Sequence, residues 1–281
     1  MRVFSRFAAS VLTVAFLFSF VGRVSAATTI TMGTARSFAV LAGSGITNTG
    51  PTTITGDIGS YPTTTQTGFG SVTGNGTNHG GDSVTQGAKT DLVAAYNDAA
   101  GQGPTTPIVA DLGGQTLVPG VYNSGSSIGL TGTVTLDGGG DPDAVFIFQA
   151  GSTLTTAGSS VVALTNGTQA CNVFWQVGSS ATLGTNSTFR GNIFALTSIT
   201  LTTGATLQGR ALARNGAVTM DSNTISVAYC TGEITPAFGS LASTNGAGPE
   251  KNIPWKLVAV SLFSVALVST GLVIVKRKQK I

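Results

Sequence analysis

The sequence has few of the residue types on which most active sites and metal centres depend. Its 281 residues include one histidine and two cysteines, and only 9% are charged. The histidine, His79, lies in a glycine-rich loop, where a solvated side chain is the simplest explanation. No cluster of cysteine and histidine has metal-ligand spacing, and no glycine-rich loop leads from a strand into a helix as phosphate binding requires. We therefore expect no metal and no cofactor.

Paired carboxylates are also poorly placed for catalysis. Asp141 and Asp143 resemble the acids of a sugar-cleaving enzyme, but they flank Pro142 after three glycines, a pattern typical of a turn before a strand. The basic residues that a polysaccharide lyase would place on its binding face are scarce. The sequence therefore predicts that the protein is not an enzyme.

The positive charge is concentrated at the two ends of the chain. Of the 14 lysine and arginine residues, only five lie within residues 27–250, whereas all 11 acidic residues lie from Asp57 to Glu250. The formal net charge of +3 therefore conceals a mildly acidic central part. Nucleic acid, which a basic protein would suggest, is not a predicted partner.

Both ends carry signals for export and for a membrane. Residues 1–26 combine a basic start, an apolar run and a small-residue cleavage site, which predicts a signal peptide; an uncleaved anchor is the alternative. Residues 255–275 contain an apolar stretch about as long as the roughly 20 residues that span a bilayer. The basic tail, residues 276–281, is then expected in the cytoplasm. These signals predict a single-pass protein of the cell membrane with an extracellular N-terminal domain, with a buried core helix as the alternative for the C-terminal stretch.

The two cysteines, Cys171 and Cys230, fall in the part predicted to be exported. An even number of cysteines outside the cell favours one disulfide, whereas a cytosolic protein would keep two free thiols. The disulfide would close a loop of about 60 residues, which contributes roughly 4 kcal/mol in the chain-entropy model.

Residues 27–230 are predicted to form one monomeric domain, built mostly of short strands with turns. One segment differs, because apolar residues recur at three- and four-residue steps over residues 82–100. This spacing predicts a helix that begins at Asp82 or Ser83 and ends at Gly101. We expect the helix to pack along the side of the sheet structure.

Two segments rich in glycine border this domain. Residues 56–81, which also contain many threonines, are expected to form a loop that caps one end of the strand structure. Residues 231–254 contain three prolines and are predicted to form a flexible tether. A flexible chain of this length spans about 25–30 Å on average.

The C-terminal half of the domain repeats itself. Similar threonine-rich segments begin at Leu183, Leu201 and Met220, at intervals of 18 and 19 residues, and another begins at Leu154 after a longer gap. Coils of this length predict a β-solenoid, in which each turn buries apolar residues against its neighbours.

Each repeat carries two hydroxyl-bearing residues that stand three positions apart, or nearly so. We interpret them as a ladder on one face of the solenoid: Thr156 with Ser159, Thr185 with Thr188, Thr203 with Thr206, and Ser222 with Thr224. Because threonine is favoured on any solvent-facing strand, an ordinary solenoid surface would also give such a ladder.

Several motifs in this order resemble the microbial ice-binding protein family. They are residues 38–43 (FAVLAG), 141–149 (DPDAVFIFQ), 172–178 (NVFWQVG) and 209–213 (GRALA), and the resemblance covers about residues 33–227. It implies an irregular right-handed β-solenoid (β-helix) with one long α-helix alongside.

The resemblance also implies a function. Many members of the family adsorb to ice, so it predicts an antifreeze, recrystallisation-inhibiting or ice-adhesion protein whose partner is an ice surface. Its flat face would be the threonine-rich ladder, since threonine carries a hydroxyl and a methyl on a stiff side chain. Residues 203–206 match the family's Thr-Ala/Gly-x-Thr/Asn pattern well, and the other repeats match it loosely. The alternative is a non-catalytic adhesion module that binds a glycan or another extracellular partner.

Overall fold

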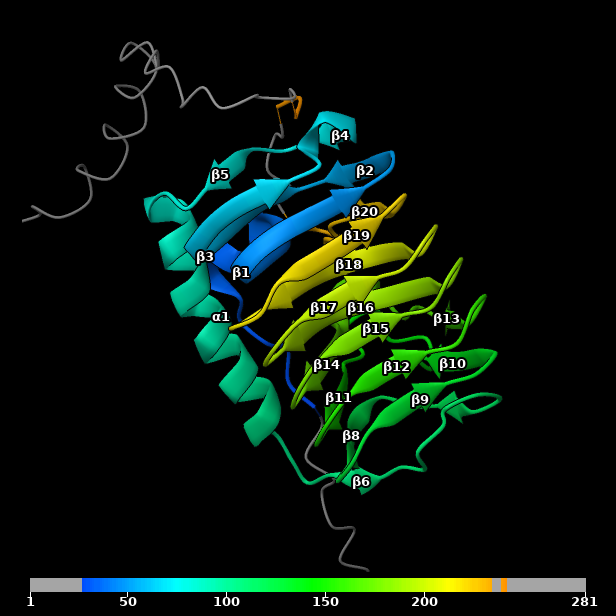
Figure 1. Ribbon diagram of the computed structural model, residues 1–281. Helices are drawn as coiled ribbons and strands as arrows, with labels where there is room; N and C mark the ends of the chain where they lie inside the picture. The colour runs from blue at the N-terminus through cyan, green and yellow to red at the C-terminus, as the bar shows by residue number, and fades with distance from the viewer. Residues whose placement is uncertain (1–26, 234–238, 242–281) are drawn as a thin grey trace, which may run out of the picture. The chain divides into compact units, whose positions relative to one another are not determined.

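The computed structural model describes residues 27–233 and 239–241, which form a β-solenoid with one α-helix along its side (Figure 1). The described part contains twenty strands, and every pairing between them is parallel. Short turns join the strands into coils with three faces. We call them the helix face, the open face and the third face.

The helix face is the stack of strands that α1 (Ser83–Gly101) lies against. Its apolar outer side packs against the buried side of α1, so this face is covered. In stacking order it contains β6 (Thr106–Pro107), β8 (Gly120–Ser124), β11 (Phe146–Ala150), β14 (Val173–Val177), the second halves of β16 (Thr188–Ala195) and β18 (Thr206–Ala213), the first halves of β1 (Phe38–Thr49) and β3 (Asp57–Thr67), and β5 (Asn78–Gly80).

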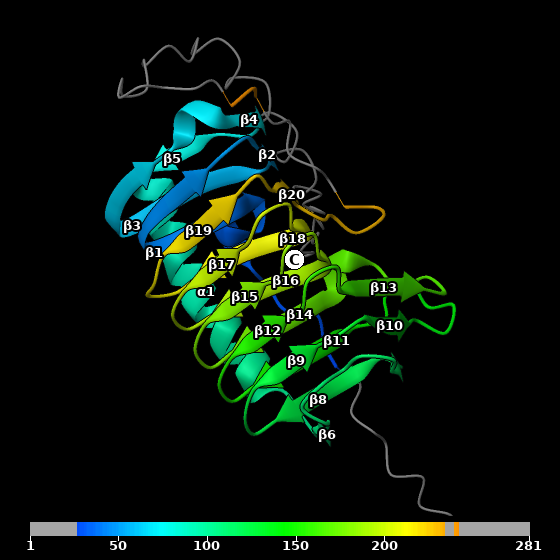
Figure 2. The ribbon, with the colours of Figure 1, turned by 45° about the vertical axis from the view of Figure 1, so that its right-hand side comes forward.

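The open face is a row of short strands that α1 does not cover, seen at the front of Figure 2. It contains β9 (Ile128–Leu130), β12 (Leu154–Thr156), β15 (Ala181–Leu183), β17 (Ile199–Leu201) and β19 (Val218–Asp221), followed by the second half of β1 and the end of β3.

The third face closes each coil. It contains β7 (Thr116–Leu117), β10 (Thr133–Asp137), β13 (Val161–Thr165), the first halves of β16 and β18, then β20 (Thr224–Ser226), β2 (Thr52–Thr55) and β4 (Val72–Asn75). Three short 3-10 helices, η1 (Gly33–Ser37), η2 (Phe69–Ser71) and η3 (Ala170–Asn172), complete the described elements.

The core fills the space between the three faces with apolar side chains from every coil. Aromatic rings stack from coil to coil within it: the ring centroids of Phe148 and Trp175 lie 3.9 Å apart, and those of Trp175 and Phe189 lie 4.9 Å apart. Each coil thus buries its inward residues against the coil above and the coil below, as the repeats predict.

The N-terminal coil and the last coil of the C-terminal half meet in the middle of the stack. β1 pairs with β18 and β19, and β2 pairs with β20, so the N-terminal coil lies directly on the last coil of the C-terminal half. In Figure 1 the blue strands accordingly lie beside the yellow ones. No local signal in the sequence indicates this long-range contact.

The predicted helix is confirmed. It begins after Asp82, whose side chain accepts a hydrogen bond from the Thr85 backbone N–H at 2.9 Å, and it ends at Gly101. One residue of the predicted stripe is misplaced: Val84 is 40% exposed, and Thr85 is buried in its place.

Two border segments differ from expectation. Residues 56–81 form β3, β4 and β5 rather than a loop, so the end of the solenoid is covered by strands. Within the predicted tether, residues 239–241 lie against β4, whereas residues 234–238 and 242–254 lie outside the described residues.

The predicted single-pass membrane localisation is corrected. In residues 27–233 and 239–241, no helix is long and apolar enough to cross a bilayer. The segments assigned to the signal peptide, the transmembrane helix and the cytoplasmic tail (1–26, 255–275 and 276–281) lie outside the described residues.

Candidate functional site

The open face presents one central threonine per strand. In β15, Thr182 lies between Ala181 and Leu183, which are both buried, while Thr182 itself is half-buried and points outward. This follows from strand geometry, in which neighbouring side chains point to opposite faces. Strands β17 and β19 repeat the arrangement with Thr200 and Thr219.

These threonines lie in register from strand to strand. We call them the strand threonines; in stacking order they are Thr155, Thr182, Thr200, Thr219, Thr47 and Thr67. Gly129 of β9 occupies the next position below them. Because neighbouring strands lie about 4.8 Å apart, the column repeats a hydroxyl and a methyl at that spacing along the solenoid.

The outward positions on the N-terminal side of the strand threonines are small in β12, β15, β17 and β19. Two residues before Thr155, Thr182, Thr200 and Thr219, on the same side of the sheet, stand Thr153, Ser180, Ser198 and Ala217. Neither this row nor the strand threonines include an aromatic or basic side chain. The face therefore has an even, weakly polar surface, held by hydrogen-bonded strands.

The turns between the open face and the third face carry two of the predicted ladder residues in equivalent positions. Thr185 and Thr203 are both exposed, and the backbone N–H after Thr185, that of Asn186, donates to the Thr203 carbonyl at 3.0 Å. The Thr203 hydroxyl donates to an Asp221 carboxylate oxygen at 2.5 Å. These threonines border the open face.

Ser159 and Ser222 occupy a different place in the same turns. Their φ angles are 58° and 55°, and they share this left-handed position with Asn186 and with Gly204. The tight turn requires that conformation, which glycine and short polar residues adopt most readily. The two serines therefore shape the corner and are not in register with Thr185 and Thr203.

Three further predicted residues lie around the corner on the third face. Thr188, Thr206 and Thr224 pair directly with one another, and the column continues through Thr53 and Thr73. Below Thr188 the column meets Val161 instead of a threonine.

The third face is less even than the open face. Arg190 and Gln208 point outward beside its threonines, with the Arg190 Nε donating to the Gln208 Oε1 at 3.3 Å. A cavity of about 600 Å³ lies beside them, bordered by Gln169 and Tyr229 among others.

Thr156, the remaining predicted residue, points into the solenoid. It is 3% exposed, and its hydroxyl accepts a hydrogen bond from the Gly184 backbone N–H at 2.8 Å. The cause is a slip of two residues in the predicted repeat, because Leu154 pairs with Ala181 rather than with Leu183. Thr156 therefore cannot present its hydroxyl to an external surface.

Sequence reasoning missed the strand threonines because it compared the turns. The available signal was a threonine between two core residues, as in residues 181–183 (ATL), 199–201 (ITL) and 218–220 (VTM). Alternation of this kind over three residues indicates an outward threonine on a strand.

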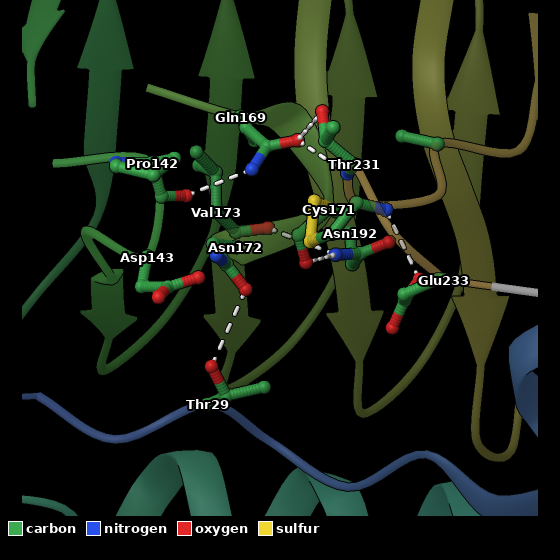
Figure 3. Close-up of a disulfide and its surroundings, with 12 residues drawn as sticks. Thr29, Pro142, Asp143, Gln169, Cys171, Asn172, Val173, Asn192, Thr231 and Glu233 are labelled. Atoms are coloured by element: carbon green, nitrogen blue, oxygen red, sulfur yellow. Dashed lines mark hydrogen bonds between the residues drawn. A yellow bond between two sulfur atoms is a disulfide. The ribbon is translucent and has the colours of Figure 1, made fainter. Parts of the chain in front are cut away.

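The predicted disulfide is confirmed. Cys171 and Cys230 are bonded, with their Cα atoms 5.5 Å apart. The bond fixes residues 227–233, which we call the strap, to η3 (Figure 3). The strap has two further contacts. The Thr231 backbone N–H donates a hydrogen bond to Gln169 Oε1 at 2.7 Å, and Glu233 forms an ion pair of 3.1 Å with Arg36.

His79 is not the solvated loop residue that the sequence suggested. Its Nδ1 lies 3.0 Å from an Asp82 carboxylate oxygen, and its Nε2 lies 3.7 Å from one of Asp57. The neighbouring Asp57 carboxylate raises the pKa of His79, against the opposing effect of burial. Because Asp82 also caps α1, this cluster ties the helix start to the solenoid. Within residues 27–233 and 239–241, no group of three or more His, Cys, Asp or Glu residues could hold a metal ion.

Together, these features define a parallel β-solenoid with a column of outward threonines on one face and a helix on another face. The chain belongs to the ice-binding-like protein family, whose model matches residues 40–226. The resemblance inferred from the motifs is thereby confirmed.

Curated relatives agree with the family model. An ice-binding protein of Nostoc sp. is 51% identical over 225 residues, which cover 79% of this chain and 83% of the relative. An ice-binding protein of Colwellia sp. is 37% identical over 233 residues, or 73% of this chain and 87% of the relative.

Solved structures show the same fold. An ice-binding protein from an Antarctic biological consortium matches with a TM-score of 0.72 and 50% identity, over 74% of this chain and 95% of that chain. One from the Antarctic ascomycete Antarctomyces psychrotrophicus matches with a TM-score of 0.69 and 44% identity, over 72% of this chain and 100% of that chain.

Proposed function

We propose that this chain binds ice through its open face. The observation that carries the proposal is the register of the strand threonines, which repeat one exposed or half-buried threonine on six successive strands. Relatives named as ice-binding proteins support the same function. Adsorption to ice needs a rigid, flat surface and no catalytic group.

The physical basis of this proposal is the fixed geometry of the column. Parallel strands hold the backbone at a constant spacing, and threonine has a stiff χ1 because two heavy atoms branch from its Cβ. The hydroxyl and methyl groups are thus held in a regular array before contact. A pre-organised surface loses little conformational entropy on binding.

The open face is better suited than the third face. Its outward residues are small, whereas Arg190 and Gln208 rise beside the threonines of the third face. Among the residues predicted from the sequence, Thr185 and Thr203 border the open face and belong to the proposed surface. Thr188, Thr206 and Thr224 form the neighbouring column, Ser159 and Ser222 form the corner, and Thr156 is excluded by its burial.

A glycan-binding module, the alternative from the sequence, has less support. Carbohydrate sites usually present aromatic rings, and neither the strand threonines nor the row beside them include one. The family and its relatives also give no observation that favours it.

The test uses residues 27–243, which end with the compact unit that contains the solenoid. Ice crystals grown in a dilute solution should become faceted and stop growing between the melting and freezing points. Thr200→Tyr on the open face should abolish this effect, because a bulky ring lifts the whole flat surface from the ice.

Two matched variants locate the surface. Thr206→Tyr places the same ring on the third face, and Thr90→Tyr places it at an exposed position of α1. Both should retain activity, and all three variants should keep the wild-type melting temperature. Round, unhindered crystals with the folded wild type would reject ice binding, whereas loss only in Thr206→Tyr would move the site to the third face.

A further inference from the structure

The end of the solenoid at β4 is a sheet edge. β4 pairs with β2 on one side, from Thr52 with Val72 to Thr55 with Asn75. Among the described residues no further coil lies on its other side, because β4 and β5 belong to the last coil of the stack. An exposed strand edge offers unpaired N–H and C=O groups to any other strand, so proteins usually cover or disrupt it.

Residues 239–241 cover this edge; we call them the capping segment. Ser240 lies opposite Asn75 in an antiparallel bridge. The Gly76 N–H donates to the Gly239 carbonyl at 2.6 Å, and the Leu241 N–H donates to the Gly74 carbonyl at 2.9 Å. In residues 27–233 and 239–241 this is the sole antiparallel bridge, so it is an addition to the solenoid rather than another coil.

The side chain of Leu241 adds an apolar anchor to these backbone bonds. It is partly buried against the same core cluster that contains Val72 and Ile54, the inward residues of the last two strands of the third face. Phe69 of η2 packs partly buried against this cluster as well. The capping segment therefore covers the sheet edge and also the end of the core.

The opposite end of the solenoid is protected by different means. β6 and β7 have only two residues each, and Pro104, Pro107 and Pro119 lie in or beside them. Proline has no N–H to donate, and short edge strands pair weakly. By contrast, β4 reads Val-Thr-Gly-Asn and contains neither proline nor charge. Its only protection in the described residues is the capping segment.

We propose that the β4 edge is a self-association surface, that the capping segment keeps it closed, and that a second copy of this chain pairs with it when the segment is displaced. The partner is a second copy because its own β4 offers the same uncharged, proline-free edge. Two such edges can pair with each other in an isologous contact. This proposal is independent of ice binding.

The test is the molecular mass in solution of residues 27–243, measured by light scattering after size exclusion over a range of concentrations. The wild type should be a monomer. Leu241→Pro removes the N–H that donates to Gly74 and also the apolar anchor, and should at least double the mass at high concentration. Ser240→Pro is the matched control: its backbone N–H takes no part in the bridge, so the variant should stay monomeric.

A second substitution separates edge pairing from general misfolding. Asn75→Lys places a charge on the edge itself, which opposes pairing with another strand. In the Leu241→Pro background it should restore the monomer. A monomeric Leu241→Pro protein, even one with a lowered melting temperature, would overturn the proposal, since the segment would then only stabilise the fold. Association that persists with Asn75→Lys would also overturn it.

Discussion

The helix face and the open face are built from the same stack of parallel coils and differ in what points outward. On the helix face the outward residues include Ile147, Phe174, Phe194 and Leu212, all fully buried beneath α1. On the open face the same type of position holds threonine. The inward residues of both faces belong to one core. Folding stability and surface function are therefore assigned to different sides of the same strands.

Polar contacts also distinguish the two faces. Gln149 of β11 is 5% exposed, and its Nε2 donates to the carbonyls of Ala99 and Gln102 at 2.9 and 3.0 Å. Helix ends leave carbonyls without partners, so Gln149 satisfies the end of α1 and fixes it on the sheet. On the open face the outward hydroxyls of Thr47 and Thr67 bond to each other at 3.3 Å, and among the described residues no corresponding contact fixes the face to another element.

The largest expected effect on stability comes from removing an apolar contact beneath α1. Phe194→Ala deletes a fully buried ring and should lower the free energy of unfolding by about 3–5 kcal/mol. The matched change on the open face, Thr200→Ala, should alter it by less than about 0.5 kcal/mol. Urea unfolding of both variants measures the difference. Equal losses would show that the open face is as important to folding as the helix face.

Opening the disulfide should have the next largest effect. Replacing both Cys171 and Cys230 by serine releases the strap from η3 and should cost roughly 4 kcal/mol, since the closed loop spans 59 residues. Thermal unfolding with and without a reductant gives an independent estimate on the wild type. Because the strap lies away from the open face, ice-crystal shaping at low temperature should survive. Loss of shaping in a still-folded variant would contradict the placement of the site.

Several features of this fold were accessible from the sequence because their signals are local. The helix over residues 82–100 has a regular apolar stripe and a capping aspartate, and the two cysteines allow only one pairing. The solenoid itself follows from coil-length repeats. These predictions depend on residues close in sequence or on the number of cysteines.

The register between coils was not accessible in the same way. Leu154-Thr155-Thr156 and Leu201-Thr202-Thr203 have the same letters, yet Leu154 aligns with Ala181 and Ile199. The coil from Val161 to Thr188 has 27 residues because it includes the long connection before β14. The next coil, from Thr188 to Thr206, has only 18. Only strand pairing reveals which threonine points inward. The contact between β1 and β18 likewise joins segments with no common local pattern.

The His79 cluster should give a smaller, pH-dependent effect. The pKa of His79 is raised, so its contribution to stability is fully present below the unfolded pKa near 6.5 and is lost as pH rises through the folded value. The pKa values of Asp57 and Asp82 are lowered, so their contribution is lost at acidic pH. Compared with His79→Gln, the wild type should be more stable by less than about 1 kcal/mol, because the cluster is partly exposed. A difference that does not change from pH 5 to pH 9 would contradict this assignment.

The smallest expected change in stability comes from exchanging single groups on the open face. Thr200→Val keeps the branched shape, the methyl and the stiff χ1, whereas Thr200→Ser keeps only the hydroxyl and rotates more freely. Both should change the free energy of unfolding by less than about 0.5 kcal/mol. If shape and rigidity dominate the contact with ice, the gap between melting and freezing points should fall more in Thr200→Ser than in Thr200→Val. The reverse order would show that the hydroxyl array, rather than the flat methyl-bearing surface, makes the main contact. The open face would then differ from the helix face mainly in the polarity of its outward side chains.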